Sequence, residues 1–435
     1  MRTKTTILKN VLKTLFPTLL FSKEMQRETG HISTSQEWNP TILGKRLPLS
    51  YLMFANLLAF VGYYFILFFP ILFAICVYNT YVLFPYTTGD ESVATFTLLW
   101  LTLSLFFGHI SYNVFTVNFG AIPGLKIKRK STGVLYNLLD TIQQHYPAAK
   151  IKQIIISGNF ELRVVKVPNI GIPLYCRRVL VVGLPLMLTL SPTEFNCLFT
   201  REIIQHSKTR VLSTAWLNQL RDVWSHYLTA PNPRSSIGHQ LLLWFFGIYS
   251  PLYNAVSLPA RLADELNTDR NALDLINSDE LLGAFQASLR ANIYLRKEFW
   301  PRIISSDNGH DIPRPFSILS RAVKSMLLQT NSNDWLQQHY LREECALRQQ
   351  PTLKQRMDNL GVSSVTLPPN LTQTAAEYYL QDHFAKIIVM SDDNWRDMQR
   401  MRVKSAHNAG VSSRLLGASG KRPDTLTKNS KAKVV

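Results

Sequence analysis

Hydrophobic residues are concentrated in two long runs in the first third of the chain. No charged residue occurs from Leu47 to Gly89, and the residues from Tyr51 to Phe84 are almost wholly apolar or aromatic. A second apolar stretch runs from Val93 to Val117, with His109 and Tyr112 as its titratable residues. Each run exceeds the roughly 20 residues that a helix needs to cross a bilayer. Because uncharged runs of this length are rare in soluble cores, we predict two membrane helices.

The segments around the two runs predict their orientation. The turn between them, Pro85 to Ser92, carries two acidic residues, whereas Lys and Arg lie before the first run and after the second. Cytoplasmic flanks of membrane helices are enriched in Lys and Arg. We therefore expect helices near 51–84 and 95–118, within a hairpin of residues 49–120 that crosses the lipid bilayer. Both flanks of the hairpin should lie in the cytoplasm.

The two ends of the chain are basic. Residues 1–48 form an arm in which Thr6 to Phe21 has apolar residues at helical spacing, interrupted by Pro17. The arm is either an interfacial amphipathic helix or a partly ordered tail. Residues 396–435 become rich in Ser, Gly and Lys toward their end, and we expect a disordered tail there.

Composition narrows the class of protein. Lys and Arg exceed Asp and Glu by 18 in 435 residues, which is typical of proteins that bind nucleic acid or an anionic membrane surface. The basic residues flank the apolar runs, and no zinc finger, RNA-recognition motif or basic zipper occurs, so we expect a membrane and no nucleic acid as partner. Four scattered cysteines without a C-x-x-C pair argue against a disulfide scaffold and a cysteine zinc site. They are Cys76, Cys176, Cys197 and Cys345.

Residues 130–395 have the pattern of an α+β domain. A short amphipathic helix from Val134 to His145 is followed by three segments rich in β-branched residues, which predict strands. Ser191, Pro192 and Glu194 then form a capping box that begins a helix reaching His206. The predicted strands are Ile151–Ile156, Glu161–Val167 and Arg178–Val182, and further helices are expected near 211–228, 237–256, 259–276, 279–297 and 313–329.

The helix that begins at Ser191 carries the pattern Arg201-Glu202-Ile-Ile-Gln205. In H-E-x-x-H peptidases, two histidines four residues apart bind zinc on one helical face, and the glutamate between them is the general base for the metal-bound water. Here Arg201 and Gln205 stand at the histidine positions and Glu202 stands at the position of the base. By itself the pattern is weak, because an ordinary amphipathic helix with a solvated charged face also has it.

Three segments, in order, resemble the membrane-associated M-48-type metallopeptidases, a family that includes CAAX prenyl proteases and HtpX. Leu180 to Arg210 is similar to the family's segment around the zinc-binding helix, and Arg261 to Ala272 resembles the helix that supplies its third zinc ligand. Pro351 to Arg356 resembles a later segment of the family. The resemblance covers about residues 130–390, and the hairpin in front of it matches bacterial members.

The resemblance implies a zincin-like peptidase domain, mainly helical with a small β-sheet, behind the membrane hairpin. It also implies a multi-pass protein of the bacterial inner membrane with a cytoplasmic domain. Zinc would be held at the positions of Arg201, Gln205 and Glu265, next to the base at Glu202. The residues around this ligand set would be Asp269, Arg261 and Arg270.

Departures from the family pattern change the expected function. A guanidinium has no free lone pair and stays charged, so Arg201 repels zinc instead of binding it, and Gln205 is a weak neutral ligand. Glu265 alone cannot hold a catalytic zinc ion. We therefore expect a catalytically inactive pseudopeptidase, without a cofactor, that acts by binding a protein or peptide partner. In it, the Arg201 guanidinium should replace the charge of the metal and pair with Glu265, Asp269 or both.

Two alternatives stay open on the sequence. An active zinc-dependent endopeptidase would need the unusual ligand set Glu202, His206 and Glu265. Glu202 and His206 do share a helical face, but this site requires the helix to rotate by about one residue, roughly 100°. The other alternative is a membrane protein unrelated to peptidases.

Overall fold

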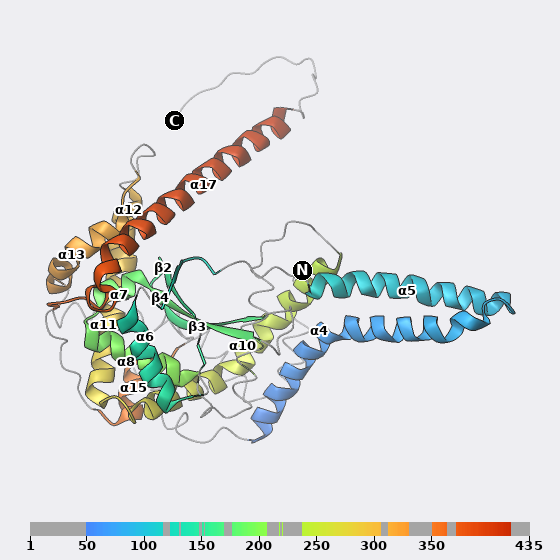
Figure 1. Ribbon diagram of the computed structural model, residues 1–435, viewed down its shortest axis with the longest axis horizontal. Coiled ribbons are helices and arrows are strands. Elements are labelled where there is room, and N and C mark those ends of the chain that lie inside the picture. The colour runs from blue at the N-terminus through green and yellow to red at the C-terminus, as the bar shows by residue number, and fades with distance from the viewer. Residues whose placement is uncertain are drawn as a thin grey trace, which may run out of the picture. The chain divides into compact units, whose positions relative to one another are not determined.

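Over the residues that it describes, the computed structural model is mostly helical, with a small four-stranded mixed sheet and two helices that are long and apolar enough to cross a membrane (Figure 1). The prediction is confirmed at this level. The predictions for residues 1–48 and for most of the helix near 211–228 lie outside the described residues. The structure describes residues 49–115, 122–129, 132–147, 150–151, 153–168, 176–206, 217, 220, 237–305, 312–329, 350–362 and 371–418.

The apolar hairpin consists of α4 (Leu49–Leu83) and α5 (Glu91–Phe115), joined by the short helix η3 (Phe84–Tyr86) and a turn. The two helices approach closely at Gly108. A Cβ atom added there would come within 2.9 Å of the Phe73 ring. Small residues permit such contacts between apolar helices. Three buried hydroxyls of α5 donate to carbonyls about one turn back in the same helix, which satisfies them without water. They belong to Thr97, Ser104 and Ser111.

The sheet has its described strands in the order β1-β2-β4-β3. Strands β2 (Gln153–Ser157) and β4 (Cys176–Gly183) pair in parallel at the centre, and β1 (Leu125–Ile127) and β3 (Leu162–Pro168) pair antiparallel at the two edges. The three predicted strands are confirmed. The sequence did not predict β1, because a three-residue strand with a central lysine carries no alternating apolar pattern. The sheet therefore begins before residue 130, the predicted start of the domain.

The main core is an apolar cluster formed by the sheet together with α6 (Gly133–His145), α7 (Leu184–Thr189) and α8 (Pro192–Gln205). The central strands contribute wholly buried residues such as Ile154 and Leu180, as is typical of parallel strands at the centre of a sheet. This packing fixes α8, the helix that carries the Arg201-Glu202-Ile-Ile-Gln205 pattern, against the sheet.

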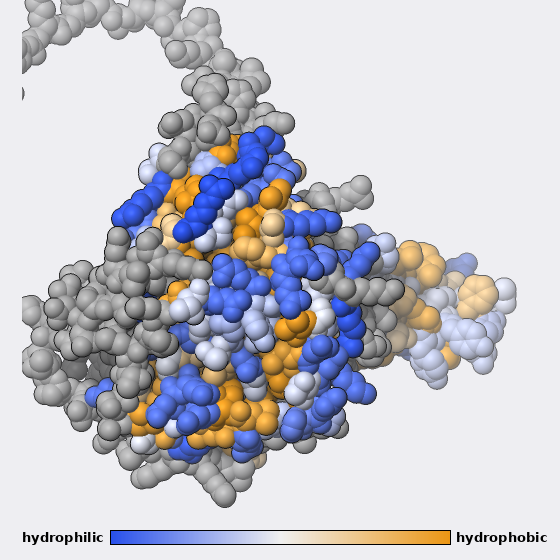
Figure 2. All heavy atoms as spheres, turned by 60° about the vertical axis from the view of Figure 1, so that its left-hand side comes forward, coloured by the Kyte–Doolittle hydropathy of each residue, from blue (hydrophilic) through white to orange (hydrophobic). Residues whose placement is uncertain are grey.

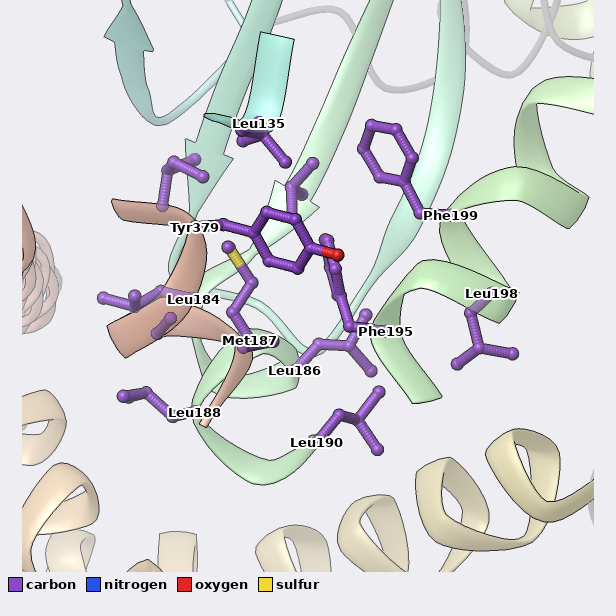
Figure 3. Close-up of a cluster of buried hydrophobic side chains, with 14 of the residues drawn as sticks. Leu135, Leu184, Leu186, Met187, Leu188, Leu190, Phe195, Leu198, Phe199 and Tyr379 are labelled. Carbon is purple, nitrogen blue, oxygen red and sulfur yellow. The ribbon is translucent and has the colours of Figure 1, made fainter. Parts of the chain in front are cut away.

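Aromatic side chains and one glycine hold α8 and α7 in place. The ring of Phe195 packs against Phe199 and Tyr379, with centroids 5.5 and 5.3 Å apart (Figure 3). At the end of β4, a Cβ atom added at Gly183 would lie 2.1 Å from the carbonyl oxygen of Asn159. Only glycine fits this close approach of two backbones, so the position where β4 passes into α7 is fixed by the absence of a side chain.

Helix α10 (Ile237–Ala272) is a single helix, whereas the sequence predicts two, near 237–256 and 259–276. The predicted boundary falls at Pro259, yet Pro251 and Pro259 both lie inside the continuous helix. A proline removes one backbone hydrogen bond, but the helix continues past both prolines. The prediction of two helices is therefore wrong, and α10 connects an apolar start to acidic residues near its end.

The next helices follow the sequence more closely. Helix α11 (Ser278–Tyr294) continues through the π-helical turn η4 (Leu295–Phe299) into α12 (Trp300–Ser305), so this run extends past its predicted end near residue 297. Helix α13 (Pro315–Gln329) lies where a helix was predicted at 313–329. The elements after it are α15 (Leu353–Leu360), α16 (Ala375–Leu380), η5 (Gln381–His383) and α17 (Phe384–Ala418).

Helix α17 corrects the prediction of a disordered tail for residues 396–418, because the helix continues to Ala418, and the rest of the predicted tail lies outside the described residues. Its first part is held by the domain: the carboxylate of Asp392 accepts from the backbone N–H groups of Phe316 and Ser317, at 2.8 and 3.1 Å, and so caps α13. On the side of the domain seen in Figure 2, strongly hydrophilic residues lie between hydrophobic ones. That mixture is typical of a surface in contact with water.

The first half of α10 belongs to a second apolar cluster, which we call the α4–α10 core. Its aromatic residues stack along one side of α10, with the Phe65 and Phe245 ring centroids 3.6 Å apart. The Tyr249 hydroxyl donates to the Leu58 carbonyl at 2.6 Å. The buried residues of this core are Ala55, Ala59, Tyr63, Ile66, Leu217, Leu220, Phe246, Tyr249, Tyr253, Val256 and Ala260.

Candidate functional site: a buried charge cluster

The candidate site begins with the capping box of α8, which is confirmed. The Glu194 N–H donates to Ser191 Oγ at 3.3 Å, and the Ser191 N–H donates to Glu194 Oε2 at 2.8 Å. This start sets the register of the helix, so that residues 201–204 are buried. Arg201 and Glu202 therefore enter the interior of the domain from a helix whose position the sheet already fixes.

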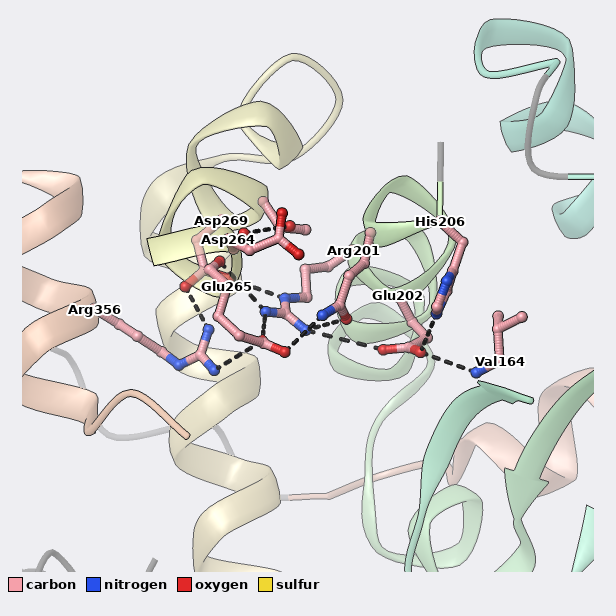
Figure 4. A network of polar contacts seen from close by, with 10 residues as sticks. Val164, Arg201, Glu202, His206, Asp264, Glu265, Asp269 and Arg356 are labelled. Atoms are coloured by element: carbon pink, nitrogen blue, oxygen red, sulfur yellow. Dashed lines mark hydrogen bonds and ion pairs between the residues drawn. The ribbon is translucent and has the colours of Figure 1, made fainter. Parts of the chain in front are cut away.

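Arg201 lies at the centre of a polar network between α8 and α10 (Figure 4). Its Nε donates to Asp269 Oδ1 at 2.9 Å, and its Nη2 donates to Glu265 Oε2. Its Nη1 donates to Gln205 Oε1 at 3.1 Å, and Gln205 Nε2 in turn donates to Glu265 Oε1 at 2.6 Å. The expectation that Arg201 pairs with Glu265, Asp269 or both is confirmed for both acids.

A second arginine completes the network, and the sequence analysis missed its role. Arg356 on α15 donates through Nη1 to Asp269 Oδ2, and its Nη2 lies 3.7 Å from Glu265 Oε2. Asp269 thus receives one guanidinium on each carboxylate oxygen. One signal pointed to it: three acids near a single Arg201 leave two negative charges unmatched. Arg356 supplies a second positive charge, and the segment around it was noted only for its resemblance.

An aromatic ring borders the two guanidinium groups. The ring centroid of Phe285 on α11 lies 4.0 Å from Cζ of Arg356 and 5.7 Å from Cζ of Arg201. The face of an aromatic ring attracts a cation, and the attraction is larger where water is excluded. Four helices therefore meet at the network, and we call its five polar members the charge cluster. They are Arg201, Gln205, Glu265, Asp269 and Arg356.

Because the cluster is buried, its ion pairs are strong, and each charged group needs its partners to offset the loss of hydration. The side chains of Arg201, Arg356 and Asp269 are 8%, 7% and 0% exposed. An ion taken out of water is costly unless opposite charges and hydrogen bonds replace its hydration. Each ionised group of the charge cluster has both, so removal of one member would leave another buried and unmatched.

The charges of the cluster shift one another's pKa values. Burial alone would raise the pKa of Glu265, but the guanidinium groups of Arg201 and Arg356 outweigh it and lower the pKa to about 2. Burial lowers the pKa of Arg201, yet the carboxylates of Glu265, Asp269 and Glu202 together raise it above its ordinary value. Glu265 and Arg201 are therefore ionised at neutral pH.

Glu202, at the position of the peptidase base, has partners of its own. Its Oε1 accepts from the backbone N–H of Val164 on β3 at 3.0 Å, and His206 Nε2 lies 3.3 Å from the same atom. Its Oε2 lies 3.9 Å from Nη1 of Arg201. The carboxylate thus joins α8 to the edge strand of the sheet while remaining beside the charge cluster.

The structure brings together the three positions at which the family resemblance places zinc ligands, because Arg201 and Gln205 both bond to Glu265. It does not assemble the alternative set of Glu202, His206 and Glu265. The Arg201 guanidinium contacts both glutamates, while His206 contacts Glu202. Within the described ranges, no group of three His, Cys, Asp or Glu side chains is placed to hold a metal ion.

The two other arginines predicted near the site have different positions. Arg270 is exposed, and its Nε lies 3.5 Å from the carbonyl oxygen of Asn359. Arg261 is half-buried on α10, one turn before Glu265.

Comparison with known proteins adds no family. The chain matches no family model, no curated protein and no solved structure.

The residues present do not fit a zinc ion at these positions. Two guanidinium groups already satisfy Glu265 and Asp269, and neither guanidinium can donate a lone pair to a metal. A divalent cation would also be repelled by two fixed positive charges at close range. What the charge cluster can do chemically is hold α8, α10 and α15 in one fixed arrangement by charge-assisted hydrogen bonds.

Proposed function

We propose that the protein is a membrane-anchored, metallopeptidase-like pseudoenzyme that acts by binding a protein or peptide. The observation that supports this most directly is the Arg201 guanidinium, which bonds to Glu265 and Asp269 at the position where an active relative would hold its zinc. The family resemblance supplies the frame, and the apolar hairpin of α4 and α5 supplies the anchor. On this proposal the domain lies on the cytoplasmic side of a bacterial inner membrane.

In this proposal the charge cluster replaces the structural contribution of a metal without replacing its chemistry. A catalytic zinc ion joins ligands from separate helices and lowers the pKa of a bound water. Arg201 and Arg356 join the same helices through Glu265 and Asp269, but a guanidinium does not acidify water. The domain would keep the shape of a peptidase, and a surface that recognises polypeptide would be used for binding only.

The decisive test is metal content and peptide hydrolysis of the purified full-length protein in detergent. We expect less than stoichiometric zinc after dialysis against zinc-containing buffer and no cleavage of unfolded casein. The Arg201→His and Gln205→His double variant should gain zinc, because it offers two imidazoles beside Glu265. This variant shows that the assay detects zinc at these positions.

The Glu202→Gln variant distinguishes the proposed pseudoenzyme from an active peptidase. The glutamine oxygen can still accept from the Val164 N–H, so the contact with β3 survives while general-base chemistry is lost. We expect the variant to complement a deletion strain as well as the wild type does. Stoichiometric zinc in the wild type, with casein cleavage that Glu202→Gln abolishes, would contradict the proposal and favour the Glu202, His206 and Glu265 site.

A further inference from the structure

The first half of α10 has an exposed side that carries large apolar residues and no charged residue. Trp244 is 65% and Ile248 is 55% exposed. No Asp, Glu, Lys or Arg occurs between Ile237 and Ala260, although exposed sides of helices in soluble domains usually carry charges. The exposed positions from 240 to 255 are Gln240, Trp244, Gly247, Ile248, Pro251, Asn254 and Ala255, of which Gln240 and Asn254 are polar.

The opposite side of this helix is built to hold it on α4. The Tyr249 and Tyr253 hydroxyls turn inward and donate to the carbonyls of Leu58 and Leu217, at 2.6 and 2.8 Å. The Tyr51 hydroxyl of α4 donates to the Val256 carbonyl of α10. These polar atoms are thus satisfied between helices without water, which is the arrangement that a bilayer requires of buried polar groups.

Gly62 permits this close contact. A Cβ atom added there would lie 2.7 Å from the Tyr249 hydroxyl and 3.0 Å from Leu220 Cδ2. The part of α4 that meets α10 includes Leu58 and Gly62, whereas Phe73, farther along α4, meets α5 at Gly108. Helix α10 therefore lies beside the first half of α4, before the part that pairs with Gly108 of α5.

The first half of α4 has an apolar exposed stripe of its own. Its members recur every three or four residues, so they lie along one side of the helix. Two helices in contact thus both expose apolar stripes, and one of these helices is a candidate membrane span. The stripe on α4 consists of Met53, Leu57, Phe60 and Tyr64, with exposures of 66%, 62%, 58% and 50%.

We propose that the first half of α10 is embedded in the interfacial layer of the bilayer, with Trp244 and Ile248 in contact with lipid. This inference rests on the proposed membrane anchor. Tryptophan and tyrosine are enriched at the interface of membrane proteins, and charged side chains are expelled from its apolar part. The helix then leaves the bilayer by Arg261, the first charged residue after Ile237.

This placement puts the charge cluster next to the membrane surface. Glu265 follows Arg261 by four residues, which is about 6 Å along a helix axis. A polypeptide bound near Arg201 and Glu265 would therefore be a segment close to a bilayer, such as the juxtamembrane part of another membrane protein.

Photocrosslinking of the full-length protein in lipid vesicles tests this placement. A benzoylphenylalanine probe replaces Trp244 in one sample, Phe106 of α5 in a second and Tyr378 of α16 in a third, and the vesicles contain a lipid with a clickable acyl chain. All three replaced side chains are aromatic and exposed, at 65%, 50% and 45%. The same probe therefore replaces a side chain of similar size at each position, and each position is accessible. We expect lipid adducts at 244 and 106 and at least tenfold fewer at 378.

Each pattern of adducts has one meaning. Adducts at 106 without adducts at 244 would overturn the embedding of α10 and leave the anchor standing. Absence of adducts at 106 would overturn the anchor, and with it the inference that rests on it. Equal adducts at 244 and 378 would also overturn the embedding, because the labelling would then not depend on α10. A fourth probe at Ile248 should label like the probe at Trp244.

Discussion

The two halves of α10 bury their polar side chains in different ways. Near its end, Glu265 and Asp269 bind two buried arginines, so each polar group depends on a charged partner. In its first half, Tyr249 and Tyr253 pack by aromatic stacking, with centroids 5.5 Å apart, and their hydroxyls reach backbone carbonyls. The first arrangement is directional and fails when one partner is lost, whereas the second spreads its free energy over many apolar contacts.

This difference shows what each half specifies. Buried ion pairs contribute little net stability compared with apolar packing of equal volume, because desolvation opposes the Coulomb attraction. These ion pairs instead select one packing of α8 against α10. Any other packing would leave buried guanidinium groups unpaired, at a large cost in free energy. Apolar packing tolerates a changed side chain better than a set of buried paired charges does. Substitutions should therefore be more severe in the charge cluster than in the α4–α10 core.

The largest effect is expected for Arg201→Ala. Its removal leaves three carboxylates beside the single remaining guanidinium of Arg356, in surroundings that exclude water. Breaking a buried pair of this kind costs about 3–5 kcal/mol. The measurement is the midpoint of thermal unfolding of the full-length protein in detergent.

Arg129→Ala is the matched control for that experiment. Arg129 also pairs with an acid, Asp140, at 2.8 Å, but its side chain is 64% exposed. An exposed pair contributes at most about 1 kcal/mol. Equal losses for Arg129→Ala and Arg201→Ala would show that burial does not distinguish the charge cluster, and the contrast between the two halves of α10 would fail.

The next largest effect concerns the pH dependence of Glu265. Its pKa falls from 4.5 to about 2 in the folded protein, so the unfolded chain binds more protons between these values. The stabilisation is complete above about pH 5 and is lost as the pH falls toward 2, with a total of about 3 kcal/mol. The difference in unfolding midpoint between wild type and Glu265→Gln should shrink over that interval.

The same titration in an Arg201→Ala background identifies the source of the stabilisation. Because Arg201 is the largest of the attractive contributions that lower the pKa of Glu265, the pH dependence assigned to Glu265 should weaken there. A dependence that is unchanged without Arg201 would assign it to other groups.

A smaller effect is expected for Gly62→Ala in the α4–α10 core. The added methyl group meets the Tyr249 hydroxyl, and that ring is held between Phe245 and Tyr253, with centroids 5.2 and 5.5 Å away. Overpacking of this kind costs about 1–3 kcal/mol. The measurement is again the unfolding midpoint of the full-length protein in detergent.

Gly247→Ala provides the control on the other side of α10. No atom lies within 4 Å of a Cβ at Gly247, so alanine there should be neutral or should stabilise the helix by about 0.5–1 kcal/mol. If Gly62→Ala were as harmless as Gly247→Ala, the close contact between α4 and α10 would not exist in solution.

Local signals in the sequence predicted part of the fold and part of the site. The capping box at Ser191 and Glu194 is readable because its donors and acceptors lie within four residues. Strands β2, β3 and β4 were predicted because each is a segment rich in β-branched residues. The pairing of Arg201 with Glu265 and Asp269 was predicted from the family resemblance, which places these positions together, and from their opposite charges.

The remaining features depend on partners that are distant in the chain. The continuity of α10 through Pro259 is not indicated by the proline itself, which predicts a boundary. Arg356 enters the charge cluster from a helix 87 residues beyond Asp269, and neither its own segment nor its spacing indicates that contact. The bond from the Val164 N–H to Glu202 likewise depends on how α8 lies along β3.

That last bond has a consequence for the sheet. Strand β3 is at its edge, and an edge strand with free N–H and C=O groups is a template on which another chain can add. The Glu202 carboxylate occupies the outward donor of Val164, so it seals the sheet at this point. A side chain of the neighbouring helix α8 thus occupies a donor that a further strand would need in order to pair with β3 at this point.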